Sequence, residues 1–209
     1  MVFRYDLRPV TPPAGEAPLE KNSGLRRLER LKKLSGRALA ETYSAQRLCR
    51  ELWESFPRAW EDGGDFVLEE DEQGKPFLLG SRLHVSLSHS GGYAAATIAD
   101  VPLGLDLQSL REISPRVLKR LYSREENAWI KLAEGAEGQK RAVRLWTMKE
   151  AYGKLLGRGI FTGPAFCAAF CGGRLQRKYP DCRFLFPAAP EGLLLTVCLG
   201  YGQEGSPAD

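Results

Sequence analysis

The residues best suited to chemistry in this chain are an acid and an amide two positions apart, in Gly104-Leu-Asp-Leu-Gln108. In a strand, alternation places the leucines on one buried face and Gly104, Asp106 and Gln108 together on the other. The oxygens of Asp106 and Gln108 could then bind one hard cation such as Mg²⁺. Gly104 is expected to leave room for a bulky ligand to approach the backbone. Taken alone, the pattern is more typical of an edge strand with a polar outer face.

A second candidate is the helical segment Trp146-Thr-Met-Lys-Glu-Ala-Tyr-Gly-Lys154. Trp146, Glu150 and Lys154 follow one another at four-residue spacing, so they share one helix face. The carboxylate of Glu150 could bind metal or accept a proton, and the ammonium of Lys154 could neutralise phosphate charge. A surface ion pair worth about 0.3–0.5 kcal/mol explains the same spacing. Lys149 is expected to support helix packing or a carboxylate.

Two further segments could contact phosphate. Ser86-Leu-Ser-His-Ser90 ends a predicted strand before Gly91-Gly92, and its hydroxyls, its imidazole and the turn amides suit an anion. Ser88 and His89 are the candidates there. Gly74-Lys-Pro76 could present Lys75 in the same way. A histidine at a hairpin corner and a lysine in a turn are each more often ordinary surface residues.

The elements that must position these residues follow from periodicity and from glycine and proline. Basic amphipathic helices are expected from Leu25 and over about 38–54, and a hairpin over 84–90 and 93–98. Strands are also predicted at 66–69 and 103–107, helices at 114–132 and 140–156, a loop at 133–139, and antiparallel strands over 160–201. Because strands and helices do not alternate regularly, the predicted class is α+β.

Composition is that of an ordinary globular chain, with 43% hydrophobic and 27% charged residues among 209. No apolar run reaches the ~20 residues that span a bilayer, and the start lacks a signal-like stretch, so a cytoplasmic location is expected. The five cysteines lack zinc-site spacing and are expected to be free thiols. The net charge of +4 is mild, but residues 21–37 carry seven basic side chains against one acid.

The order of these motifs is more specific than any one of them. G-K-P, S-L-S-H-S, P-L-G-L-D-L-Q and W-T-M-K-E-A-Y-G-K-L-L-G-R-G together resemble the Sfp-type phosphopantetheinyl transferases. Leu121-Tyr-Ser-Arg-Glu-Glu-Asn-Ala-Trp129 is similar to the family's segment between the last two motifs. The resemblance runs from about residue 74 to 161. It implies an α+β pseudodimer of two similar halves, 1–102 and 103–209, each an antiparallel sheet packed with helices, with coenzyme A in the cleft between them.

The resemblance also implies catalytic roles. Asp106 and Glu150 would hold Mg²⁺ against the pyrophosphate of coenzyme A. Glu150 would help to deprotonate a carrier-protein serine, whose hydroxyl attacks the β-phosphate and releases 3′,5′-ADP. Lys154 would neutralise the growing charge. The family usually has glutamate where this chain has Gln108, so Gln108 or a water is expected as the third ligand, with a modest contribution.

The remaining roles concern binding. By the resemblance, Lys75, Ser88 and His89 would contact the phosphates of coenzyme A, and His89 is counted with the catalytic group. Candidates for the 3′-phosphate are Arg26, Arg30 and Arg37.

The expected partners are acidic acyl or peptidyl carrier proteins, which a basic surface would steer, with residues 111–129 as the candidate docking surface or else an ordinary amphipathic helix. Neither a membrane nor nucleic acid is expected as a partner, and the internal pseudo-symmetry implies a monomer. The two alternative functions are a nucleic-acid-binding module and a metal-dependent phosphohydrolase. A nucleic-acid-binding module would call for aromatic residues within 21–37, where there are none. A metal-dependent phosphohydrolase generally has more clustered carboxylates.

Overall fold

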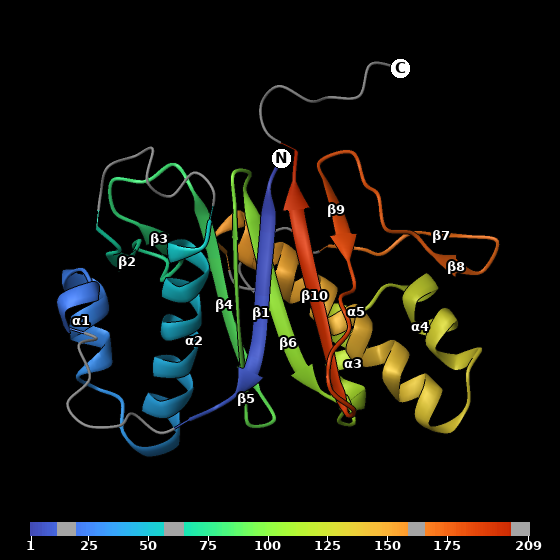
Figure 1. Ribbon diagram of the computed structural model, residues 1–209. Coiled ribbons are helices and arrows are strands. Elements are labelled where there is room, and N and C mark those ends of the chain that lie inside the picture. The colour runs from blue at the N-terminus through green and yellow to red at the C-terminus, as the bar shows by residue number, and fades with distance from the viewer. Residues whose placement is uncertain (12–19, 57–64, 159–165, 202–209) are drawn as a thin grey trace.

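Two three-stranded antiparallel sheets lie side by side in the computed structural model, which describes residues 1–11, 20–56, 65–158 and 166–201 (Figure 1). The first has the order β1 (Phe3–Pro9), β5 (Tyr93–Ala99), β4 (His84–Ser90). The second has the order β6 (Leu103–Ser109), β10 (Leu193–Gly200), β9 (Cys182–Leu185). Strands β4 and β6 are the neighbours where the two sheets meet. Two short hairpins complete the strands, β2 (Leu68–Glu70) with β3 (Pro76–Leu78) and β7 (Phe170–Cys171) with β8 (Arg174–Leu175).

Each sheet is covered by one long helix. Helix α2 (Gly36–Glu54) packs on β4 and β5, and helix α5 (Gly135–Leu156) packs on β6 and β10. The shorter helices are η1 (Glu20–Asn22), α1 (Leu25–Leu31), α3 (Pro115–Leu121) and α4 (Arg124–Lys131). Within the described ranges, none of the helices is both long and apolar enough to cross a membrane.

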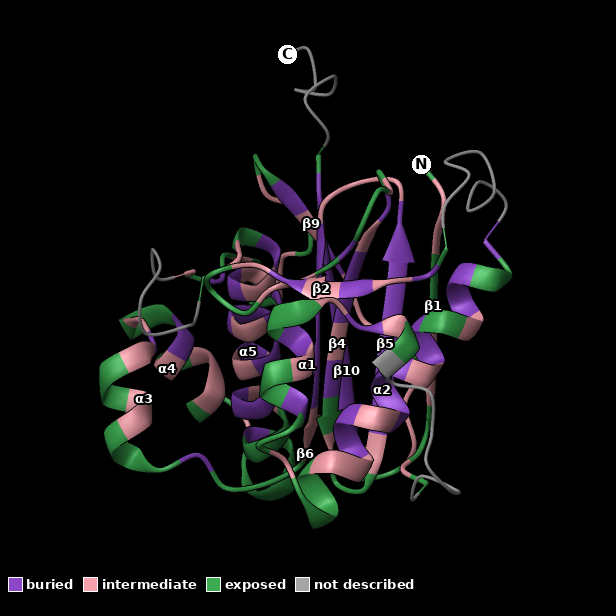
Figure 2. Cartoon of the chain, turned by 90° about the vertical axis from the view of Figure 1, so that its left-hand side faces the viewer, coloured by how far each residue is buried: buried purple, intermediate pink, exposed green. Residues whose placement is uncertain are grey.

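The apolar core has three parts that follow this layering. One lies between α2 and the first sheet, and one between α5 and the second sheet. The third joins the sheets and contains the leucines of β6 together with those of β10 and with alanines of β5. Figure 2 shows the central strands as the most buried part of the chain. The predicted α+β class is therefore confirmed, as is the buried leucine face of residues 103–107.

Three local predictions need correction. The helix predicted over 114–132 is two helices, because Ser123 begins α4 with a capping box in which Glu126 bonds back to the Ser123 backbone. The loop predicted at 133–139 is largely the first turn and a half of α5, which begins at Gly135. The strand predicted at 66–69 is shifted to 68–70. Of the strands predicted over 160–201, the described part holds β7 to β10, and residues 160–165 lie outside the described residues.

A buried ion pair fastens α5 to α4. Lys149 Nζ lies 2.9 Å from Glu126 Oε1, and both side chains are almost fully buried. Glu126 also accepts the backbone N–H of Ser123 and of Ala168, while Lys149 donates to the carbonyl of Phe166. The expectation that Lys149 supports packing and a carboxylate is confirmed. Because every polar atom of the pair has a partner, the pair fixes α4 and the start of the segment at 166 against helix α5.

We predict that Lys149→Met lowers the free energy of unfolding by about 3–5 kcal/mol, because it leaves the Glu126 carboxylate buried without its cation. Urea unfolding at pH 7 measures the change. The control is Arg50→Met, which removes an exposed pair with Glu54 on α2 and should change stability by only about 0–1 kcal/mol. Equal effects of the two substitutions would contradict the buried-pair account.

Candidate active site

A cavity of about 490 Å³ lies where the two sheets and their helices meet. Its walls come from α1, α2 and the β2–β3 turn on one side, and from β6 and α5 on the other, with β4 between them. It is lined by Arg27, Arg30, Thr42, Glu70, Gln73, Gly74, Lys75, Pro76, Ser86, Leu87, Ser88, His89, Asp106, Gln108, Glu150, Lys154, Gly157 and Arg158. The cavity therefore brings together residues from all four sequence motifs.

The floor of the cavity is a seam of serine hydroxyls between β4 and β6. Ser86 Oγ accepts the N–H of Leu105 at 3.0 Å, and Ser88 Oγ accepts the N–H of Leu107 at 3.1 Å. Ser90 Oγ accepts the N–H of Ser109 at 3.0 Å. The hydroxyls take the place that backbone carbonyls have in a sheet ladder, so β6 is satisfied although it is not paired with β4 through the backbone.

Asp106 is the buried carboxylate at the centre of this seam, with 3% of its surface exposed. Its Oδ1 accepts from Lys154 Nζ at 2.9 Å and from Ser88 Oγ at 3.1 Å. Its Oδ2 is buried and has no hydrogen-bond partner among the described residues. A buried carboxylate oxygen without a donor is costly, so a bound group is expected to satisfy it.

Glu150 lies close enough to Asp106 for the two charges to interact. Burial raises the pKa of Glu150, and the Asp106 carboxylate raises it further, while Lys154 and Arg111 act in the opposite direction. Two carboxylates facing one cavity with one close ammonium leave negative charge in excess at this point. No group of three or more His, Cys, Asp or Glu side chains able to hold a metal occurs in the described part of the chain; besides the two carboxylates, the amide of Gln108 also lines the cavity.

Gly104 has a different role from the one predicted. A β-carbon at this position would overlap the carbonyl oxygen of Ala151 and the backbone nitrogen of Leu155. The missing side chain therefore makes room for helix α5, not for a ligand. Since α5 crosses β6 at this close approach, Glu150 and Lys154 are brought down onto Asp106.

The ammonium of Lys154 lies inside the seam. It donates to the carbonyl of Leu105 at 2.9 Å and lies 3.1 Å from Ser88 Oγ, in addition to its contact with Asp106. About 32% of its side chain remains exposed toward the cavity. Ser88 thus has Leu107, Asp106 and Lys154 as partners, which leaves its hydroxyl occupied within the protein.

The opposite wall is basic. Lys75 Nζ donates to the carbonyl of Leu155 at 2.7 Å, and burial lowers its pKa, opposed by Asp71. Arg30 lies 3.2 Å from Glu70, and Arg158 is exposed at the rim. His89 Nδ1 lies 3.2 Å from Glu41, and burial lowers the pKa of its imidazole despite that carboxylate.

Two of the predicted arginines do not reach the cavity. Arg26 pairs with Glu72 and Arg37 pairs with Glu41, with 55% and 73% of their side chains exposed. Arg30 does line the cavity, as do the other predicted residues Lys75, Ser88, His89, Asp106, Gln108, Glu150 and Lys154. The last glycine of the fourth motif, Gly159, lies outside the described residues.

Sequence reasoning missed Arg27. It is 1% exposed, donates to Gln46 and Glu70, and leaves Nη2 buried without a hydrogen-bond partner beside the cavity. A signal was available, because Arg27 precedes Leu31 by four residues and these are the two buried positions of α1. Glu70, which holds Arg27 and Arg30, gave no such signal, since only the tertiary structure brings β2 beside α1.

Comparison with known proteins gives one family match and several curated relatives. Residues 102–186 match the family model ACPS, the 4′-phosphopantetheinyl transferase superfamily. The chain is 33% identical over 119 residues to 4′-phosphopantetheinyl transferase psf-1 of Bacillus pumilus, a match that covers 55% of this chain and 51% of the relative. It is 27% identical to 4′-phosphopantetheinyl transferase gsp of Aneurinibacillus migulanus, over 46% of this chain and 40% of the relative.

A third relative is 4′-phosphopantetheinyl transferase Sfp of Bacillus subtilis (strain 168), 29% identical over 47% of this chain and 45% of the relative. The matches thus span about half the length of these relatives or less. Neither the family match nor these relatives support the nucleic-acid-binding or phosphohydrolase alternatives. The ordered motifs, the family match and the relatives together support assignment of the chain to the Sfp-type 4′-phosphopantetheinyl transferase family.

Proposed function

We propose that this protein transfers the 4′-phosphopantetheine arm of coenzyme A to a serine hydroxyl of an apo acyl or peptidyl carrier protein and releases 3′,5′-ADP. The observation that carries the proposal is the group of Asp106, Glu150 and Lys154 at the floor of a cavity with a basic wall. Acids at one end and cations at the other suit a donor whose pyrophosphate must be both bound and attacked. The relatives that the chain matches bear the name of this activity.

We also infer that residues 1–102 and 103–209 form two similar halves of a pseudodimer. The strand orders support this, because each sheet places its first strand in sequence at one edge, its last in the middle and the one before it at the other edge. A long helix covers the sheet in both halves. The cavity lies where the two halves meet, so one chain could form the whole donor site, and we propose that the protein acts as a monomer.

The residues present fit a bound Mg²⁺. Asp106 Oδ2 lacks a donor, and Glu150 shares the cavity with Asp106 and the amide of Gln108. Oxygen donors of this kind, completed by water, are what Mg²⁺ prefers. Asp106 and Glu150 would hold the ion, with Gln108 or a water in the third place. When bound, it would supply positive charge to offset that of the pyrophosphate.

Glu150 is the proposed proton acceptor. Burial and the neighbouring Asp106 make its carboxylate more basic than usual, which favours removal of the serine proton. The serine oxygen then forms a bond to the β-phosphorus, the bond from that phosphorus to the bridging oxygen breaks, and 3′,5′-ADP leaves with that electron pair. Lys154 lies beside Asp106 and would offset charge on the departing phosphate.

The basic wall is the proposed seat of the donor phosphates, through Lys75, Arg30 and His89, with Arg158 and Arg27 as additions from the structure. We assign Ser88 to a different task from the one implied by the resemblance. Its hydroxyl already has three protein partners, so it is better suited to orienting Asp106 than to holding phosphate. Arg26 and Arg37 remain candidates only for more distant electrostatic attraction.

For partners, we propose acidic carrier proteins and no role for nucleic acid or membranes. Residues 111–129 support a docking surface, because Arg111, Arg116, Lys119 and Arg120 give it positive charge and α3 has no buried residue. A cytoplasmic location is proposed because all five cysteines are free thiols.

The direct test is to incubate the protein with coenzyme A, Mg²⁺ and apo-carriers from fatty-acid, polyketide and peptide synthetases, then to measure carrier masses. We expect at least one carrier to gain one phosphopantetheine on its serine. The control carrier has that serine replaced by alanine and should gain nothing. No gain on any carrier would count against the proposed function.

The ligand ranking is tested by comparing Asp106→Ala with Gln108→Ala in the same assay. We expect Asp106→Ala to lose activity by on the order of 100-fold or more, because it removes a charge aimed at the developing phosphate charge, and Gln108→Ala to lose less than about tenfold. Asp106→Asn keeps the size of the side chain and should match Asp106→Ala if charge is decisive. Equal losses at positions 106 and 108 would refute the ranking.

Glu150→Gln should stabilise the free protein while abolishing most of its activity. The folded-state pKa of Glu150 is raised above the unfolded value, so its ionisation opposes folding once the pH exceeds about 4.5. The variant should therefore unfold at a higher temperature than the original protein at pH 7, and the gain should vanish below about pH 4.5, where both states bind the proton. Thermal unfolding from pH 4 to 8 measures this.

The matched control is Glu54→Gln, an exposed acid on α2, which should show no pH-dependent gain of this kind. Transfer activity of Glu150→Gln should fall by about 10²–10⁴-fold. A variant that is less stable at neutral pH, or that keeps full activity, would contradict the roles given to Glu150.

A further inference from the structure

We propose a second ligand site, for a small polyphosphorylated anion, in a cavity on the other side of helix α5. The cavity measures about 520 Å³ and is bounded by α4, the first half of α5, the β7–β8 hairpin and Phe186. Neither the family resemblance nor the proposed transfer reaction uses it. None of its lining residues is shared with the cavity that holds Asp106 and Glu150.

The charge of this cavity is strongly unbalanced. Its lining includes the cations Lys140, Arg141, Arg144, Arg174 and Arg177, and Glu137 is the one acid among the described residues that line it. Glu137 pairs at 3.7 Å with Arg141, one turn along α5. Among the described residues, no carboxylate lies within ion-pair distance of Arg144 or Arg177. Most of the positive charge in the cavity is therefore not neutralised by carboxylates of the described residues.

Two of these cations are held close together. The guanidinium carbons of Arg144 and Arg177 lie 4.4 Å and 4.9 Å from the centre of the same Phe186 ring. Burial, followed by the charge of Arg177, lowers the pKa of Arg144 to about 10. Like charges gathered in a partly enclosed space repel each other, and an anion bound in the cavity beside them would offset that repulsion.

The walls of the cavity are fixed by hydrogen bonds to neutral groups. Arg144 Nη1 donates to the carbonyl of Leu195 at 2.7 Å and to Thr196 Oγ1 at 2.8 Å. Arg141 Nη1 donates to the carbonyl of Trp129 at 2.8 Å and its guanidinium lies over the Trp129 ring. The indole of Trp129 donates to the carbonyl of Gly173 at 3.1 Å, which ties the hairpin to α4. These bonds hold the guanidinium groups in place without neutralising their charge.

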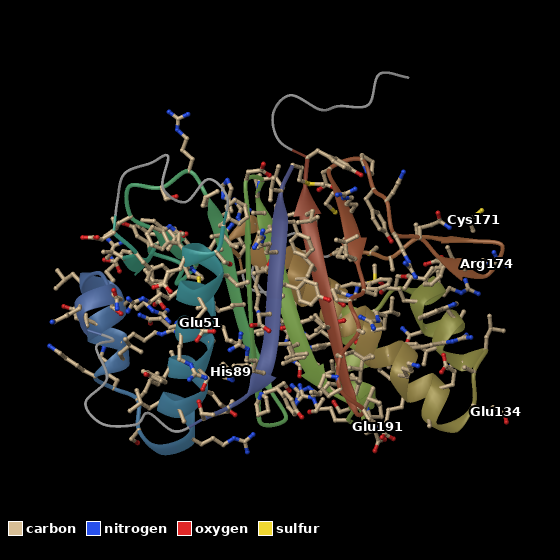
Figure 3. The ribbon with its side chains drawn as sticks, in the orientation of Figure 1. Glu51, His89, Glu134, Cys171, Arg174 and Glu191 are labelled. Carbon is tan, nitrogen blue, oxygen red and sulfur yellow. The ribbon has the colours of Figure 1, made fainter. Side chains whose placement is uncertain are left out.

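The chemistry of the lining favours phosphate as the ligand. Four of the five cations are arginines, whose planar donor forks match phosphate oxygens. The cavity volume falls in the range of small-molecule sites, roughly 300–1,000 Å³. Figure 3 shows Arg174 and His89 on opposite sides of the central strands, so one small anion cannot occupy both cavities. A concave site of this size fits a compact polyphosphate better than a broad protein surface.

The test is a titration with tripolyphosphate followed by ¹⁵N NMR, with one signal for each cavity. The indole N–H of Trp129, identified by its loss in Trp129→Phe, reports on the second cavity, and the imidazole of His89 reports on the cavity with Asp106. We expect the Trp129 signal to shift in a saturable way. Arg174→Gln combined with Arg177→Gln should weaken binding at Trp129 by about tenfold or more. Both side chains are exposed, so the fold should survive.

The matched control is Arg47→Gln combined with Arg50→Gln, which removes the same charge from α2 and should leave the Trp129 titration within twofold of the original protein. ATP in a parallel titration shows whether a base adds to the affinity. No shift at Trp129, equal weakening by the two double variants, or tighter binding of a poly-glutamate peptide than of tripolyphosphate would overturn the proposal. Because the readout does not depend on phosphopantetheine transfer, the result tests the second site independently of the proposed function.

Discussion

The arrangement of this molecule depends on the serine seam between β4 and β6. Ser86, Ser88 and Ser90 satisfy three N–H groups of β6 that would otherwise be buried without acceptors. Each such loss would destabilise the fold by about 1–3 kcal/mol, whereas a made bond contributes about 1 kcal/mol. The seam thus joins two sheets that do not pair through their backbones. The same row of hydroxyls forms the floor of the cavity, so the contacts that join the two sheets also build the candidate site.

The charges and hydrogen bonds at the floor of the cavity are not fully balanced within the protein. Lys154 donates to one oxygen of Asp106, and the other oxygen has no donor among the described residues. Burial, together with the nearby Asp106 carboxylate, raises the pKa of Glu150. The close packing of α5 over Gly104 enforces that proximity. Neutralising Glu150 would improve stability, but it would weaken the proposed capacity to gather positive charge and phosphate. Such opposition between stability and function is common at catalytic sites.

The sequence predicted the parts of the site that are local. Spacing alone placed Glu150 and Lys154 on one helix face and Asp106 on a strand beside buried leucines, and motif order suggested that they meet. Contacts between residues distant in sequence could not be predicted from the sequence. Nothing near Arg27 indicates that Glu70 will satisfy it, and nothing in Ser88 distinguishes a phosphate contact from an acceptor for β6. Gly104 was misread because open space and a crossing helix both call for glycine. The break before α4 was missed although Ser123 and Glu126 form a recognisable capping pair.

The strand order has a consequence for how the chain is made. In the second sheet the middle strand, β10, is the last of the three to leave the ribosome. It begins at Leu193, some 84 residues after β6 ends at Ser109. Until then one edge of the leucine-rich β6 has no partner from its own sheet. During that interval a nascent chain exposes an apolar strand of the kind that pairs wrongly with other chains. The same delay holds in the first sheet, where β1 ends at Pro9 and its partner β5 begins only at Tyr93, so both sheets depend on slow, long-range pairing.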